Sequence, residues 1–463
     1  MSHASAALSL RLAQFVTLMP RGQLPQATLH AAARVLLDAT GVIRAASSLA
    51  QVQPFIAEAS SLGSGPCSVL GTNVRTRAEL AALANGAMAH ALDYEDTLDA
   101  APVHPNASLV PAILALAQAH GPISAMALLD AIAMGCEITC RLALCLRRPL
   151  EDGGWYPPPI LGAWGAVAAA ARLLALSPRQ LLDAWSLLLL QNSCAGEIKC
   201  DPHTVLRAVR EAFPAQAAVQ VTRLALAGVR GFDAPLEGQN GFFRLFAQGE
   251  YEPDVLFHEL GQNWQVQALS FKPWPSCRGT HAAIECALLL REAIAGDWGQ
   301  IRTLRIEGCR VHRMLAEPAL RKQAPQTAID AKFSLPFTAA TALVRGRVDL
   351  DSFEAAALQD RQVLELAGRA SFAAREDWAS TQAVSGAVEI TLAGGRTLRQ
   401  QVLQPRGSPG NRLADEQLLA KFVDCAGRAK SALAQAAAAA MGRQILELEN
   451  CPEGAVTVAQ ICQ

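Results

Sequence analysis

The stretch from Asn85 to Leu109 reads NGAMAHALDYEDTLDAAPVHPNASL and holds two histidines, four carboxylates and a threonine. Upstream of it, Thr76 and Glu79 stand at capping-box spacing in front of an apolar run. This pattern predicts a helix that continues past His90 towards Asp93. Residues three or four apart lie on one face of a helix, so these two side chains would be neighbours.

The second half of the stretch changes from helix to loop. Thr97 follows the aspartate by four residues and would extend the same face, and Pro102 and Pro105 then break the chain. Asn106 is expected to cap a new helix, with His104 just before the cap. The positive end of a helix beside a histidine suits an anionic ligand. The alternative, an exposed acidic turn between two helices, fits the same pattern.

The composition predicts a helical protein with a large core. The chain has 463 residues, of which 51% are hydrophobic and 17% charged, and Ala and Leu dominate. The length suits two or three domains, or one large domain with a smaller one attached. Lys and Arg number 40 against 41 Asp and Glu, which gives no electrostatic case for binding nucleic acid or an anionic membrane surface.

The cysteines and the apolar runs predict a cytoplasmic protein. There are 12 cysteines, without a CxxC pair or zinc-like spacing. Such scattered cysteines are typical of a reduced protein. The first residues lack the ordered zones of a signal peptide. The uncharged run Trp155 to Ala171 contains Pro and Gly, so we expect a buried helix there and no membrane span.

Helical patterns dominate both ends of the chain, and strand patterns appear between them. TLRIEGCRV (303–311) alternates with period two, and GAVEITLAGGRTLRQQVL (386–403) reads as two strands around Gly394-Gly395. We therefore expect a mostly α protein. A large all-helical domain, built from residues 1–265 and 404–463, would accompany a smaller α+β domain of residues 266–403.

Several long motifs occur in a fixed order along the chain. They are AHALDYEDT, HPNASLVPAILALAQ, PPPILGAWGAVAAAARLL, LEGQNGFF, FKPWPSCRGTHAAIE and DAKFSLPF. Together they resemble the MmgE/PrpD family, the 2-methylcitrate dehydratase family. The resemblance covers most of the chain. It implies a fold made of a helical domain from both chain ends and an α+β domain.

The resemblance also implies an activity. Family members act on small di- and tricarboxylates and include 2-methylcitrate dehydratase, cis-aconitate decarboxylase and iminodisuccinate epimerase. They need no metal or organic cofactor and form homodimers. These reactions create a carbanion-like centre beside a carboxylate, which needs a base, an acid and cations.

The family site maps onto matching positions of this chain. The resemblance implies that Asp93 and His104 exchange protons and that Thr97 bonds the ligand, with Lys272 from the FKP motif nearby. Cys277 and Arg278 lie on the probable substrate loop. The planar fork of the arginine suits a carboxylate, whereas the cysteine is expected to pack.

Three positions depart from the family pattern. Tyr156 stands where many members have His, and Arg207 where many have Lys. Phe337 replaces the Tyr of the SLPY motif. Tyrosine is a poorer base than histidine at neutral pH, and arginine cannot shuttle protons. Lys199 and His203 lie close by in sequence and are candidates to compensate.

The leading hypothesis is therefore a cofactor-independent lyase of the 2-methylcitrate dehydratase type. Its partners would be a small carboxylate substrate and a second copy of the chain. An epimerase or decarboxylase shares the same carbanion and stays open, as does a catalytically weak carboxylate-binding member. If Tyr156 and Phe337 line the pocket, we expect a substrate with fewer charges than a tricarboxylate, because each buried carboxylate needs a partner.

Overall fold

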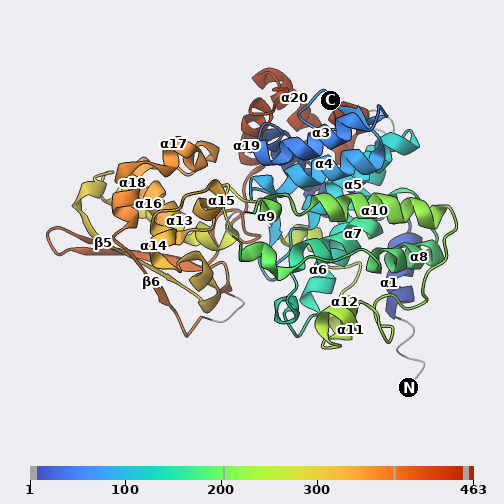
Figure 1. Cartoon of the computed structure of the whole chain (residues 1–463), viewed down its shortest axis with the longest axis horizontal. Helices are drawn as coiled ribbons and strands as arrows, with labels where there is room; N and C mark the ends of the chain where they lie inside the picture. The colour runs from blue at the N-terminus through green and yellow to red at the C-terminus, as the bar shows by residue number, and fades with distance from the viewer. Residues whose placement is uncertain (1–7, 202–203, 379–381, 452–457, 463) are drawn as a thin grey trace. The chain divides into compact units, whose positions relative to one another are not determined.

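The computed structural model describes residues 8–201, 204–378, 382–451 and 458–462. It is mostly α, as expected, with small sheets (Figure 1). The chain divides into two compact units. Unit 1 comprises residues 1–91, 95–269 and 414–463, and unit 2 comprises residues 92–94 and 270–413. The predicted domain boundaries at 265/266 and 403/404 stay predictions.

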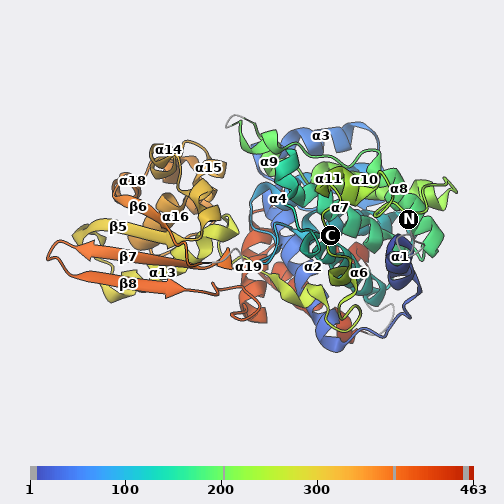
Figure 2. The same cartoon turned by 90° about the horizontal axis from the view of Figure 1, so that it is seen from below.

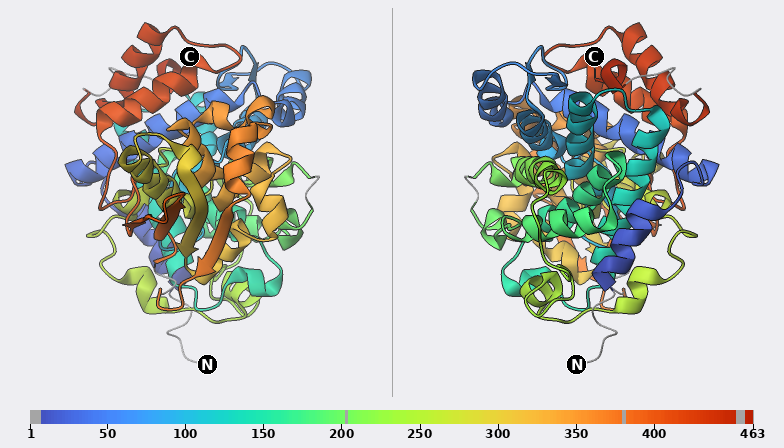
Figure 3. Two further views of the ribbon diagram at one scale, coloured as in Figure 1. Left: turned by 90° about the vertical axis from the view of Figure 1, so that its left-hand side faces the viewer. Right: turned by 90° about the vertical axis from the view of Figure 1, so that its right-hand side faces the viewer.

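Unit 1 is a helical assembly to which both ends of the chain contribute. The C-terminal helices, red in Figure 1, pack beside the blue N-terminal helix α2. Figure 3 (right) looks onto the helices of this unit. Its helices are α1 (Leu8–Leu18), α2 (Gln26–Ala46), α3 (Gln53–Ser61), α4 (Ala78–Ala91), α5 (Pro105–His120), α6 (Ala125–Leu144), α7 (Pro157–Leu173), α8 (Pro178–Leu189), α9 (Leu206–Val209), α10 (Ala212–Leu226), α11 (Phe242–Ala247), α12 (Pro253–Phe257), α19 (Asp415–Gly427), α20 (Gln435–Leu446) and α21 (Val458–Ile461).

Small residues and caps shape these helices. Ser177 and Gln180 form a capping box at the start of α8, where Pro178 is the first helical residue. Every residue of α7 is buried. A Cβ on Gly165 of α7 would lie 2.4 Å from the carbonyl oxygen of Gly135 in α6, so only glycine permits this crossing.

Unit 1 is not entirely helical, which corrects one expectation. A short hairpin joins β1 (Cys67–Ser68) to β2 (Arg75–Thr76), and β3 (Thr97–Leu98) follows α4. The predicted capping box before α4 is also wrong. The hydroxyl of Thr76 donates to the carbonyl of Gly63 at 3.2 Å, because this threonine belongs to the hairpin.

Unit 2 is a four-stranded sheet with helices on one face (Figures 1 and 2). The strand order is β6-β5-β7-β8, with β5 parallel to β6 and the other pairs antiparallel. Figure 3 (left) shows the unit from a second direction. Its elements are β5 (Ile301–Gly308), β6 (Ala370–Ala374), β7 (Gly386–Leu392), β8 (Thr397–Val402), α13 (His281–Ala293), α14 (Ala319–Gln323), α15 (Ala328–Lys332), α16 (Leu335–Arg345), α17 (Ala355–Leu358) and α18 (Arg361–Ala367).

The hairpin predicted at Gly394-Gly395 is confirmed. Ile390 pairs with Leu398 across it, and Gly395 adopts φ 81°, which glycine permits. The strand predicted over 303–311 is confirmed as β5, although it ends at Gly308. At the start of unit 2, β4 (Leu269–Ser270) has two residues and follows a 3-10 turn over residues 265–268.

Membrane insertion was not expected. In the described ranges, no helix combines the length and the apolar character needed to cross a bilayer.

Candidate functional site

The predicted shared helical face of His90, Asp93 and Thr97 does not form, because α4 ends at Ala91. The chain bends instead, and Asp93 adopts φ 50° in the left-handed region that non-glycine residues seldom occupy. Residues 92–94 belong to unit 2, whereas their neighbours on both sides belong to unit 1. The side chains of this stretch therefore belong to two clusters. One, in unit 2, contains Asp93, and the other, in unit 1, contains His90 and His104.

The cluster in unit 2 centres on a buried ion pair. The Nζ atom of Lys272 lies 2.6 Å from Oδ1 of Asp93 and 3.0 Å from its backbone oxygen. The two side chains are 0% and 2% exposed. Burial removes the hydration of both charges, so each relies on the other for stabilisation. The sequence placed both residues in the site, and the structure brings them together.

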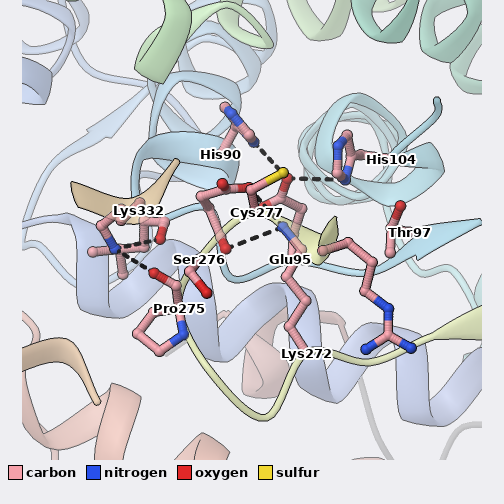
Figure 4. A network of polar contacts seen from close by, with 12 residues as sticks. His90, Glu95, Thr97, His104, Lys272, Pro275, Ser276, Cys277 and Lys332 are labelled. Atoms are coloured by element: carbon pink, nitrogen blue, oxygen red, sulfur yellow. Dashed lines mark hydrogen bonds and ion pairs between the residues drawn. The ribbon is translucent and has the colours of Figure 1, made fainter. Parts of the chain in front are cut away.

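A second buried lysine contacts the same bend. Lys332, at the end of α15, donates to the carbonyl oxygens of Leu92 at 2.6 Å and Pro275 at 2.9 Å (Figure 4). The sequence reasoning did not single out this residue. The sequence feature that could have identified Lys332 is the DAKFSLPF motif, in which this lysine lies between the apolar residues Ala331 and Phe333.

The cluster in unit 1 consists of two histidines around one carboxylate. Oε1 of Glu95 lies 2.5 Å from Nδ1 of His90 and 3.1 Å from Nδ1 of His104, as the dashes in Figure 4 show. The ring centroids are 5.5 Å apart. Glu95 was part of the quoted motif but was not proposed as a site residue. A carboxylate between two imidazoles fixes their orientation and stabilises a proton on either ring.

His104 is the N-cap residue of α5, the position that the sequence assigned to Asn106. Its Nδ1 also lies 2.9 Å from the carbonyl oxygen of Asp96. A carbonyl oxygen only accepts, so Nδ1 carries a proton and Nε2 is the nitrogen suited to proton exchange. Asn106 lies inside the first turn and donates to the carboxylate of Asp96 at 2.9 Å.

Thr97 is buried beside this cluster. Its hydroxyl donates to the carbonyl oxygen of Val103 at 3.2 Å. A bond from Thr97 to a ligand therefore needs the ligand as donor, because the hydroxyl has one proton and two lone pairs.

Tyr156 and the arginines form a third group in unit 1. Tyr156 precedes α7, and the guanidinium carbon of Arg210 lies 5.1 Å from its ring centroid. Nε of Arg210 bonds Oε1 of Glu211 at 3.1 Å, and Glu211 accepts from Ser108 of α5 at 2.5 Å. Arg210 thus connects the tyrosine to the first turns of the helix that His104 caps.

Arg207, which stands where many family members have Lys, lies one turn earlier on α9 and is half-buried. Its backbone oxygen accepts from Nη1 of Arg210 at 3.0 Å. Of the two proposed compensating residues, Lys199 places its Nζ atom 5.5 Å from the Tyr156 ring centroid, and His203 lies outside the described residues.

A cavity of about 290 Å³ lies next to this group within unit 1. Arg210 lines it together with mostly apolar neighbours such as Pro159, Phe213 and Ala217, and Asn192 contributes an amide. The carboxylates of Glu197 and Asp201 also line the cavity, and Arg210 is paired with Glu211, so the positive charge of Arg210 is offset by acidic neighbours.

The FKPWPSC segment and the residues after it are fixed by backbone contacts. Arg278 donates to the carbonyl of Arg406 at 3.0 Å and to the hydroxyl of Ser408 at 2.5 Å. These bonds give it a structural role, and its role as a carboxylate clamp stays a prediction. Cys277 is half-buried and donates its N–H to the carbonyl of Lys332 at 3.0 Å.

His281 is a buried histidine of unit 2 that the sequence reasoning missed. Burial, with the positive charges of Arg278 and Lys272, holds its pKa well below the usual 6.5. The neutral ring donates from Nε2 to the carbonyl of Ser276 at 3.2 Å. It therefore fixes the FKPWPSC segment without carrying charge.

Phe337 lies in the hydrophobic core of unit 2, where its ring packs 6.4 Å from that of Phe353. A tyrosine hydroxyl at this position would enter an apolar environment. Its proposed effect on specificity stays a prediction.

One group of side chains in the described residues has ligand atoms close enough for a metal ion. His90, Asp93 and Glu95, all within six residues of chain, offer atoms within 4.8 Å of one another. Asp93 already bonds Lys272, and His90 bonds Glu95, so a cation would have to displace these contacts. The expectation of a metal-independent site stays a prediction.

Comparison with known families decides the membership. The sequence model of the MmgE/PrpD N-terminal domain matches residues 10–254, and that of the C-terminal domain matches residues 274–445. The chain belongs to the MmgE/PrpD family. Asp93, Thr97 and His104 fall within the first matched range, and Lys272 lies just before the second.

Relatives in the MmgE/PrpD family carry decarboxylase names. A cis-aconitate decarboxylase-like protein of Aspergillus oryzae is 26% identical over 86% of each chain. Human cis-aconitate decarboxylase is 26% identical over 76% of this chain and 73% of its own. The cis-aconitate decarboxylase of Aspergillus terreus is 22% identical over 97% of both.

Proposed function

We propose that the chain is a cofactor-independent lyase that decarboxylates a small unsaturated di- or tricarboxylate. The buried Asp93–Lys272 pair carries this proposal, because it places a carboxylate and a cation together in a family whose similar members are named decarboxylases. The sequence favoured dehydration of the 2-methylcitrate type. The names of the relatives favour the decarboxylase alternative.

The proposed reaction breaks one carbon–carbon bond. The bond to a carboxylate cleaves, carbon dioxide leaves, and the electron pair stays on the carbon skeleton as an allylic carbanion. A proton must then reach carbon, and His104 is assigned as its donor through Nε2, with Glu95 holding the ring. Lys272 and Arg210 are assigned to neutralise substrate carboxylates. Asp93 is assigned to orient Lys272 and to exchange protons.

Carbon dioxide release with cis-aconitate as the first substrate tests the proposal. We expect carbon dioxide and an unsaturated acid one carbon shorter, at the same rate with and without a chelator. The Lys272→Met and His104→Gln variants should lose this activity. Carbon dioxide release that a chelator abolishes, or the absence of release from any unsaturated di- or tricarboxylate in a panel, contradicts the proposal.

Two alternatives begin instead with removal of a C–H proton beside a carboxylate, and the carbanion formed in this way gives different products. Dehydration of 2-methylcitrate would raise the ultraviolet absorbance of an unsaturated acid without carbon dioxide. Epimerisation would incorporate solvent deuterium with no loss of mass from the skeleton. Either result would replace decarboxylation in the proposal.

The third candidate is a carboxylate-binding member with little turnover. The observation that favours it is the replacement of the family histidine by Tyr156, whose ring packs against Arg210. A thermal-shift screen of di- and tricarboxylates identifies a binder, because a ligand stabilises the state that binds it. Stabilisation by a compound that is not turned over supports this candidate.

We further propose a cytoplasmic homodimer that associates through the helical unit. Apolar side chains on α9 and α10 are exposed, including Leu206 at 52% and Phe213 at 57%. All twelve cysteines are free, which suits a reducing compartment. A monomeric mass in light scattering at micromolar concentration contradicts the dimer.

A further inference from the structure

Lys332 has a buried ammonium group that the proposed reaction does not use. It is 4% exposed and lies 4.6 Å from the ring centroid of Phe353. It donates to the carbonyls of Leu92 and Pro275, which are 183 residues apart in sequence and belong to the same unit. A buried charge needs several polar partners, so these contacts are structurally demanding.

The first acceptor bears on the backbone of Asp93. Leu92 precedes the residue at φ 50°, and Lys332 holds its carbonyl oxygen. The carbonyl of Asp93 itself is held by Lys272 at 3.0 Å. Ammonium groups therefore fix the peptide units on both sides of the aspartate. An unusual backbone conformation persists when surrounding contacts determine it in this way.

The second acceptor bears on Lys272. Pro275 lies three residues after Lys272, in the same FKPWPSC segment. The ammonium group of Lys332 donates to the carbonyl oxygen of this proline. The backbone oxygen of Lys332 accepts from the N–H of Cys277 at 3.0 Å. One residue thus joins the segment that carries Lys272 to the bend that carries Asp93 (Figure 4).

We propose that Lys332 is a positioning residue that sets the geometry of the Asp93–Lys272 pair. It acts through two backbone carbonyls and has no direct part in the chemistry. The consequence for turnover rests on the proposed function, whereas the consequence for the geometry of the pair does not.

The test compares Lys332→Met with a matched control in the same unit. Methionine keeps the length and apolar contacts but removes the ammonium. Lys322→Met is the control, because Lys322 is also buried, at 7% exposed, and donates to the carbonyl of Phe333 at 2.8 Å, away from residues 92–94. A crystal structure of each variant, together with kcat and KM, is the readout.

In Lys332→Met we expect Asp93 to leave the left-handed region and the contact between Lys272 and Oδ1 of Asp93 to open. We expect kcat to fall about 10- to 100-fold, as when other orienting partners are removed, with a change in KM of about threefold or less. The control should keep the pair and most of its kcat, with a similar loss of thermal stability.

If the contact between Asp93 and Lys272 is unchanged in the structure of Lys332→Met, the inference is wrong, and this result does not depend on the substrate. A fall in kcat no larger than that of Lys322→Met overturns its catalytic consequence. If the wild type proves inactive on every carboxylate, the proposed function fails, and the structural comparison still decides the inference. If the methionine variant does not fold, Lys332→Gln, which keeps one donor without the charge, takes its place.

Discussion

The two buried clusters around residues 90–95 differ in the kind of charge they hold. In unit 1, Glu95 lies between the imidazoles of His90 and His104, a type of side chain that serves as a proton donor or acceptor in enzymes. In unit 2, Asp93 lies against the ammonium of Lys272, which keeps its charge unless it is strongly perturbed. The proposed function uses the two clusters differently: His104 of unit 1 is assigned to donate a proton, and Lys272 of unit 2 is assigned to neutralise a carboxylate.

Removal of the fixed cation should have the largest effect. Lys272→Met leaves the buried carboxylate of Asp93 without this partner, which costs about 3–5 kcal/mol of unfolding free energy. We expect kcat to fall beyond detection. Urea unfolding and turnover assays measure both. Lys421→Met, which breaks the buried pair with Asp38 in unit 1, is the control and should lose stability while keeping activity.

Loss of the carboxylate between the imidazoles should have a smaller effect. Glu95→Gln keeps the volume but weakens the orientation of His104, and we expect kcat to fall about 10- to 100-fold. Glu137→Gln removes another buried glutamate of unit 1, which bonds Arg141 at 2.5 Å, and should leave kcat near that of the wild type. Equal kcat in the two variants would show that Glu95 does not serve proton transfer.

Replacement of the two arginines next to Tyr156 should have smaller effects, and these effects should be on KM. Arg210 is buried and lines the cavity, whereas Arg207 is half-buried and does not. We expect Arg210→Gln to raise KM about tenfold, which corresponds to loss of one charged contact of about 1.4 kcal/mol. Arg207→Gln should change KM about twofold. The reverse order would return the carboxylate-binding role to Arg207.

The smallest expected effect is a difference in acid sensitivity between the units. Burial lowers the pKa of His281 and His312 in unit 2 below the usual 6.5. The unfolded chain binds protons at these histidines near pH 6.5 and the folded chain does not. Their contribution to the free energy of unfolding is therefore complete above pH 6.5 and is lost as the pH falls below it. In unit 1, burial raises the pKa of Asp130 and Glu137, so protonation of these two carboxylates favours the folded state.

Hydrogen exchange at pH 7.5 and 5.5 measures this difference by unit. We expect protection to fall more in unit 2 than in unit 1 on acidification. His312→Gln should reduce the acid-induced fall in Tm by about 2–4 °C. An equal loss of protection in both units would contradict this expectation.

Local patterns predicted much of the fold. The buried helix over α7 and the hairpin at Gly395 both depend on residues close together in the sequence. The motifs also brought Asp93, Lys272 and His104 into the candidate site. The end of α4 was missed, because the helical pattern continues through Leu92 while the left-handed conformation of Asp93 comes with contacts from distant residues.

The contributions of Lys332, His281 and Arg210 were missed for a related reason. Lys332 bonds the backbone carbonyls of Leu92 and Pro275, and a backbone carbonyl is present at every position, so the sequence does not mark these acceptors. Arg210 lies in a break between α9, which ends at Val209, and α10, which begins at Ala212, and helix propensity alone does not mark this break.

The Asp93–Lys272 pair also sets an order of events during synthesis. The two residues are 179 positions apart, so at usual translation rates Lys272 is made about 10 to 40 s after Asp93. In that interval the aspartate has no access to its ammonium partner, and residues 92–94 have no unit 2 to join. A chain truncated before Lys272 lacks both the ammonium partner of Asp93 and residues 414–463 of unit 1, so it can form neither this ion pair nor the complete helical unit.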